Sequence, residues 1–152
     1  MITTRITVKP HICEYVRGKY AGFDETKPVQ FPSHSDIYFL IWDFLVKRPA
    51  GCHRDDGNLE IILPSRHGAK PPEYYNYLGI HARKIIGRRL EMMMWADYRM
   101  HVEEARSRGM MFISATEQFM SRYGILSLSE DAFQKNYYRW RRKSYTHSRK
   151  AI

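Results

Sequence analysis

Residues 114–143 read SATEQFMSRYGILSLSEDAFQKNYYRWRRK and predict two helices joined by a short turn. Ser114 precedes Glu117 by three residues, which is the spacing of a capping box at a helix start. Gly124 then stands where a left-handed residue would end that helix. A second capping box begins at Ser127 and opens the next helix. Two short helices around a glycine-containing turn predict a helix-turn-helix unit in the last third of the chain.

The second of these helices is predicted to have one apolar face and one basic face. Phe133, Tyr137 and Trp140 recur at helical spacing and are expected to be buried. The candidate DNA contacts lie elsewhere on this helix or follow it: Lys135, Tyr138, Arg139, Arg141, Arg142, Lys143, Arg149 and Lys150. Seven Lys or Arg and no Asp or Glu follow Phe133, in a chain whose net charge is +9. Such a concentration of positive charge is typical of a surface that binds a polyanion.

The basic helix predicts duplex DNA as a partner, with different roles for its residues. Four of them are expected to face the major groove, where an arginine can pair bidentately with guanine: Lys135, Tyr138, Arg139 and Arg142. The remaining cations are expected to contact phosphates, which adds affinity without reading sequence. In the alternative interpretation the basic face is only solvated, and the two helices pair solely to bury their apolar sides.

The segment FMSRYGI…SLSEDAFQKNYYRWRRK resembles the helix-turn-helix of homeodomain-like and transposase-associated DNA-binding domains. In those domains an RYGI-type turn precedes a helix that ends in YxRW/R. The turn ILSLS is longer here than the usual three or four residues. The whole chain is similar in style to small proteins of bacterial prophages and other mobile elements. The resemblance implies a non-enzymatic DNA-binding protein that acts as a regulatory or accessory factor of such an element.

Length and composition place the chain among small intracellular domains. A chain of 152 residues is long enough to bury a core without disulfides or metal. No apolar run approaches the roughly 20 residues that a membrane-spanning helix needs, and the first residues lack the apolar stretch of a signal peptide. The two cysteines, Cys13 and Cys52, form no disulfide framework. We therefore expect a cytoplasmic protein without a membrane partner.

Upstream of the helix-turn-helix the sequence predicts a small sheet and further helices. Three extended segments are expected, at residues 3–8, 29–31 and 58–63. Pro10 is expected to begin one helix, and the capping pattern at Ser33 predicts an apolar helix that continues to Arg48. Residues 73–78 are expected to form one turn of helix at most. The predicted fold is therefore α+β and mostly α, with the sheet in the N-terminal part.

A single long helix is predicted from Ile80 to about Arg108, with a length of about 40 Å. Its apolar stripe either belongs to the core or also packs against a second copy, which would make a homodimer through the long helix. The opposite face carries cations that either contact phosphates or are simply solvated: Arg83, Lys84, Arg88 and Arg89. The predicted organisation is residues 1–64 as a small α+β region, 65–109 as a loop and the long helix, 110–143 as the helix-turn-helix, and 144–152 as a disordered basic tail.

No pattern in the sequence predicts catalysis, a metal ion or a cofactor. The pair His11 and Cys13 lacks the spacing of a structural zinc site, as does the pair Cys52 and His53. The carboxylates near Glu60 match no metal-site pattern, and the motifs for phosphate loops, dinucleotides, nucleophile elbows and zinc proteases are missing from the sequence. We therefore predict that the protein is not an enzyme.

Two other classes of function fit the composition. The protein could be an interaction module whose aromatic surface binds another protein, in which case the basic tail only aids solubility. It could instead bind single-stranded nucleic acid by stacking bases on exposed tyrosines. The tyrosines considered for such stacking are Tyr74, Tyr75, Tyr77 and Tyr138.

Overall fold

The computed structural model describes residues 2–53, 55–66 and 68–150, and of residues 145–150 it describes the backbone alone. The fold is mostly α within the α+β class, as predicted. In chain order the elements are β1 (Thr3–Ile6), α1 (Pro10–Tyr20), α2 (Asp36–Phe44), β2 (Val46–Lys47), β3 (Leu59–Ile62), β4 (Tyr75–Tyr77), α3 (Ile80–Ser107), α4 (Phe112–Tyr123) and α5 (Glu130–Lys150).

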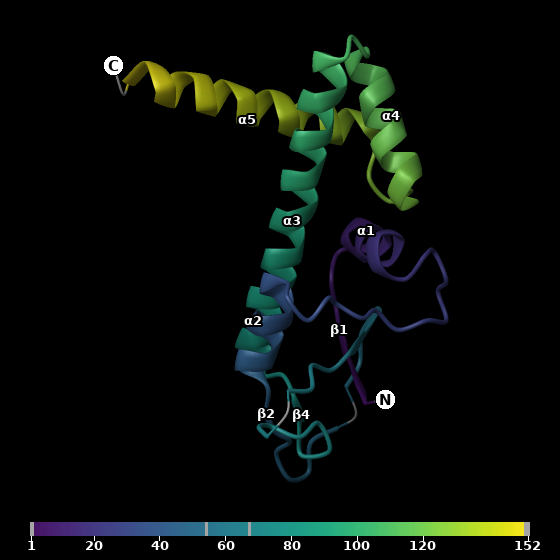
Figure 1. Cartoon of the computed structure of the whole chain (residues 1–152), viewed down its shortest axis with the longest axis vertical. Coiled ribbons are helices and arrows are strands. Elements are labelled where there is room, and N and C mark those ends of the chain that lie inside the picture. Colours follow the sequence, from purple (N-terminus) through teal and green to yellow (C-terminus); the bar gives the residue numbers. More distant parts are fainter. Residues whose placement is uncertain (1, 54, 67, 151–152) are drawn as a thin grey trace.

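The long helix α3 forms the axis around which the other elements are arranged (Figure 1). Helix α4 lies beside its C-terminal half, and α5 crosses that half and extends beyond it, whereas the strands and α2 gather around the N-terminal half. One buried stripe runs along the whole helix: Ala82, Ile86, Leu90, Met94, Tyr98, Val102 and Ala105. This spacing of three and four residues confirms the predicted long helix, because it keeps one face turned toward the core.

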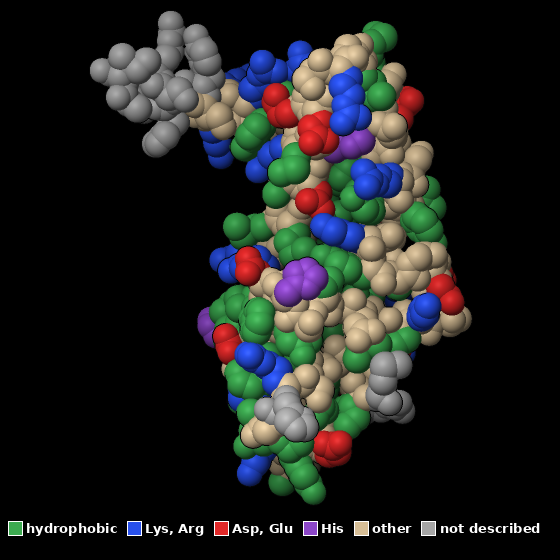
Figure 2. Space-filling view, in the orientation of Figure 1, with side chains coloured by type: hydrophobic (Ala, Val, Ile, Leu, Met, Phe, Trp, Pro, Cys, Tyr) green, Lys and Arg blue, Asp and Glu red, His purple; other side chains and the backbone are tan. Residues whose placement is uncertain are grey.

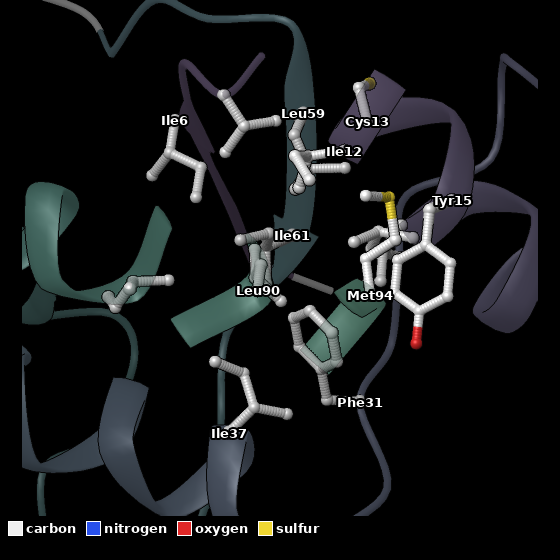
Figure 3. Packing of buried hydrophobic residues seen from close by; sticks show 14 of the residues in the cluster. Ile6, Ile12, Cys13, Tyr15, Phe31, Ile37, Leu59, Ile61, Leu90 and Met94 are labelled. Carbon is white, nitrogen blue, oxygen red and sulfur yellow. The ribbon is translucent and has the colours of Figure 1, made fainter. Parts of the chain in front are cut away.

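The predicted N-terminal strands pair with each other. Strands β1 and β3 are antiparallel, with Thr3 opposite Ile62 and Ile6 opposite Leu59. Val29 adds a parallel bridge to Ile61, which is the short extended piece expected at residues 29–31. Side chains from this sheet meet α1 and α3 in the core, as Figure 3 shows.

A second small sheet corrects two expectations. Residues 75–77 form strand β4 rather than a turn of helix, and β4 pairs with β2. Helix α2 therefore ends at Phe44, short of the predicted end at Arg48. Arg48 explains the preference for this arrangement, because its guanidinium donates to the side-chain oxygen of Asn76 at 3.0 Å and so holds the two strands together.

None of the three serines that the sequence predicts as helix caps has this role in the structure. Helix α2 is capped by Ser35, whose hydroxyl accepts from the Tyr38 N–H at 3.3 Å. The hydroxyl of Ser129 accepts from Ala132 at 3.2 Å at the start of α5, where the sequence predicted Ser127. Helix α4 begins two residues before Ser114 and has no side-chain cap. A capping pattern shows that a helix starts nearby, and tertiary contacts then select the serine that is used.

The last residues are helical where the sequence predicted a disordered tail. Helix α5 continues without interruption to Lys150. Its sequence contains no Pro or Gly between Glu130 and Lys150, and Arg and Lys are good helix formers, so nothing local ends the helix. The last two predicted tail residues, 151 and 152, lie outside the described residues.

The C-terminal helices share one core with the N-terminal elements. Gly18 of α1 lies so close to α4 that a Cβ there would be 2.4 Å from the Tyr123 carbonyl oxygen. The Tyr15 hydroxyl donates to Asp97 of α3, and Asp97 also forms an ion pair with Lys19 at 2.6 Å. Helix α1 is therefore fixed to both α3 and α4.

Candidate nucleic-acid interface

Helix α5 is held in place by aromatic packing. Phe133 and Tyr137 are fully buried. The Phe133 ring lies 4.8 Å from the ring of Tyr98 and 5.3 Å from that of Trp95, between ring centroids. Tyr98 is fully buried as well, and this burial raises the pKa of Tyr98 to about 12, so its hydroxyl stays neutral beside Thr116. This packing confirms the predicted apolar face at Phe133 and Tyr137, while Trp140 is half-buried.

A polar junction fixes the crossing of α5 over α3. The Tyr137 hydroxyl donates to Glu103 at 2.6 Å and accepts from Arg141 at 3.2 Å. Arg99 of α3 donates to the side-chain oxygen of Asn136 at 3.0 Å, and burial lowers the pKa of the Arg99 guanidinium. Arg141, which the sequence assigned to phosphate contacts, therefore has one guanidinium nitrogen committed to the junction.

The turn between α4 and α5 is held by a residue of α1. Gly124 ends α4 in the left-handed conformation, as predicted, and Ile125 then donates to the Met120 carbonyl at 2.9 Å. One oxygen of Glu14 accepts from the backbone N–H groups of Leu126 and Ser127, and its other oxygen accepts from the Ser127 hydroxyl. Ser127 is thus occupied by Glu14, which explains why the cap of α5 moves to Ser129.

The opposite side of α5 is an exposed basic face. We call Lys135, Tyr138, Arg139, Arg142 and Lys143 the outer face of α5, and all five are exposed. Lys135 forms an exposed ion pair with Asp131, and the Tyr138 ring lies 5.2 Å from that of Phe112. Arg139 and Lys143 form no hydrogen bond or ion pair with any residue that the structure describes. Their charges are therefore available for an external anion.

Two of the predicted DNA contacts, Arg149 and Lys150, have side chains outside the described part of the structure. Their backbone belongs to α5. In Figure 2, lysine and arginine side chains gather where α5 leaves the body of the molecule. The structure thus brings the predicted residues from Lys135 to Lys143 together on one helix.

The tyrosines considered for base stacking do not form one surface. Tyr74 is 68% exposed and lies just before β4, at the N-terminal end of α3. Tyr75 and Tyr77 are half-buried beneath Lys47 and Arg48, respectively. Tyr138 lies on α5, near the other end of α3, which is about 40 Å long. A single strand would have to span this length to stack on all four rings.

A polar pocket of about 490 Å³ lies beside β1. Its charges are already paired, since Arg48 lies 2.6 Å from Asp55 and Arg5 lies 2.9 Å from Glu60. Although burial opposes ionisation, hydrogen bonds from Arg48 and Thr4 lower the pKa of the Asp55 carboxyl. Within the described residues, no group of three or more His, Cys, Asp or Glu is placed to hold a metal ion. This pocket is therefore a closed ion-pair network that ties β1 to β4.

None of the described helices combines the length and apolar character that crossing a bilayer requires. The search of family models found no match for the chain, and neither the curated proteins nor the solved structures contain a match. Among the described residues, the outer face of α5 is the feature whose geometry and charge point to a function.

Proposed function

We propose that the protein is a non-enzymatic DNA-binding protein that places the outer face of α5 in the major groove of duplex DNA. One observation carries the proposal: α5 is fixed by a buried aromatic face, while its opposite face exposes Arg139 and Lys143, which form no hydrogen bond or ion pair with the described residues. The resemblance of residues 114–143 to helix-turn-helix domains supports the same assignment.

The dimensions of α5 support insertion into a groove. The helix crosses α3 and extends beyond the body of the molecule, so its C-terminal half is accessible from several sides (Figure 1). The major groove of B-DNA is about 12 Å wide and admits a helix with its side chains. Within this proposal Arg139 and Arg142 read base edges, whereas Lys143 contacts a phosphate. Arg141 contributes charge, although its geometry is set by Tyr137.

The biological role that follows from the resemblance is regulatory or accessory, within a mobile element. A homodimer through α3 is a separate proposal. It is based on the face of α3 away from the core, where Met92 is 60% exposed and Met100 is 64% exposed. Such a dimer would carry two α5 heads and suit a DNA site with two halves. Sedimentation of the free protein measures its mass. A monomer mass would rule out the dimer, and the proposal that α5 binds DNA would stand.

The proposed function is tested by fluorescence anisotropy with a labelled random duplex of about 24 base pairs over a salt series. Each phosphate contact contributes about −0.9 to the slope of log K against log salt. Contacts from four or five cations therefore predict a slope of about −4, with unlabelled duplex as the better competitor and poly-dT as the poorer one. Stronger competition by poly-dT would favour single-strand binding, and no binding at low salt would leave α5 as a solvated helix.

A further inference from the structure

The face of α3 that α5 covers continues toward the N-terminus of α3 as a basic surface. Trp95, Arg99 and Arg106 contact α5. Arg88 precedes these residues by 7, 11 and 18 positions, which correspond to about two, three and five helical turns. Arg88 therefore projects from α3 in the same direction in which α5 lies. Lys84, one turn earlier, lies next to it on this face.

These two residues border a small positive pocket of about 170 Å³ between α3 and the segment before α1. Its charged lining consists of Lys9, Arg83, Lys84, Arg88 and Glu91, which is four cations and one anion, or a net charge of +3. Glu91 is already paired with Lys9 at 2.8 Å. Lys84 and Arg88 are exposed and form no hydrogen bond or ion pair with the described residues. The pocket therefore suits a singly or doubly charged oxyanion such as a phosphate.

The position of the pocket matches the path of a duplex that lies on α5. Arg88 is 11 residues from Arg99 and 18 from Arg106, so it lies about 17–27 Å from the crossing of α5 along α3. At 3.4 Å per base pair this is about five to eight base pairs. A helix is about 10 Å thick and the major groove about 8.5 Å deep, so insertion of α5 brings the phosphate ridges close to the surface of α3.

We propose that Lys84 and Arg88 form a second DNA contact, which binds a backbone phosphate about five to eight base pairs from the groove that α5 occupies. This inference rests on the proposed function of α5. It assigns α3 a mechanical role, in which a rigid helix sets the distance between the two contacts. The contact adds affinity but no sequence preference, because it meets only the backbone.

The test compares two adjacent arginines on duplexes of two lengths. Arg88→Glu is expected to weaken binding to a 24-base-pair duplex at least tenfold, and to change binding to an 8-base-pair duplex less than twofold. The short duplex, when centred on α5, extends only about four base pairs to either side and stops short of the second contact. Arg89→Glu makes the same charge change one position further along, where the side chain projects about 100° away. It is expected to have a much smaller effect on the long duplex. The double variant Lys84→Ala/Arg88→Ala removes one phosphate contact and should reduce the salt slope by about 1.

Equal losses for Arg88→Glu and Arg89→Glu would overturn the inference, as would equal losses on the two duplex lengths. The exposed positions leave the fold unperturbed, and thermal unfolding of each variant verifies this. If the wild type binds duplex through α5 but Arg88→Glu binds as tightly as the wild type, the second contact is ruled out and the proposed function of α5 stands. If the wild type binds no duplex, the proposed function fails and the second contact fails with it.

Discussion

Charge reversal on the outer face of α5 is expected to abolish duplex binding. The variant Arg139→Glu/Arg142→Glu replaces two cations by two anions, which changes the charge opposite the DNA by four. Loss of two phosphate or base contacts and repulsion by the new carboxylates together predict a loss in affinity of at least about 100-fold near 0.1 M salt. Both residues are exposed, so the stability of the fold should change by less than about 0.5 kcal/mol. Anisotropy with the labelled 24-base-pair duplex measures the loss.

The matched control for this variant is Lys27→Glu/Arg89→Glu. It makes the same change in net charge at two exposed positions that lie away from α5. We expect the control to lose less than about tenfold, since only the long-range field of the protein changes. Similar losses in the two variants would show that net charge alone drives binding and that α5 is not the DNA-binding element.

The substitution Phe133→Ala is expected to have the largest effect on stability. Phe133 is fully buried between α3 and α4, and its ring contacts those of Trp95, Tyr98 and Phe119. Removal of a buried phenylalanine costs about 3–5 kcal/mol, a large part of the 5–15 kcal/mol that stabilises a typical domain. Denaturant unfolding followed by circular dichroism measures the free energy of unfolding.

Phe133→Leu serves as the conservative control, because it keeps most of the buried volume and should cost less than about 1.5 kcal/mol. We also expect Phe133→Ala to weaken duplex binding, since α5 loses its anchor on α3. A cost below about 1 kcal/mol for Phe133→Ala would mean that α5 is not packed through this face. The polar junction at Tyr137 would then be the main attachment of the helix.

The helices could be predicted because their signals are local. A stripe at every third or fourth residue identifies α3 and the buried face of α5, and Gly124 identifies the end of α4. The same periodicity places Lys135, Arg139 and Arg142 on one outer face without any knowledge of the tertiary structure, whereas Arg141 turns toward Tyr137. For this reason Lys135, Tyr138, Arg139, Arg142 and Lys143 lie together on the exposed side of one helix.

The remaining features depend on contacts between distant residues. Glu14 lies more than a hundred positions before the turn that it holds, and a glutamate in α1 has no sequence signal for that role. The spacing around Ser127 predicts a helix cap, but in the structure this serine binds Glu14 instead. Strand β4 was missed because a run of tyrosines has no clear period, and its partner β2 has only two residues.

The sequence likewise does not predict that Arg88 points to the side of α3 on which α5 lies. The four cations of the long helix were recognised as a group, but only the contacts of Trp95, Arg99 and Arg106 show which of them face the same way as α5. Arg83 instead donates to the Leu78 carbonyl at 2.9 Å, so it secures the start of α3. Side-chain direction thus separates structural cations from those available to a ligand.

Hydrogen–deuterium exchange of the full chain, with and without saturating 24-base-pair duplex, locates the surface that DNA covers. We predict that DNA slows amide exchange most over residues 130–143, with a second protected segment around residues 84–88. Unchanged exchange in α5, together with protection around Tyr74 and the strand that follows it, would rule out α5 as the DNA-binding element. The nucleic-acid interface would then lie at the opposite end of α3.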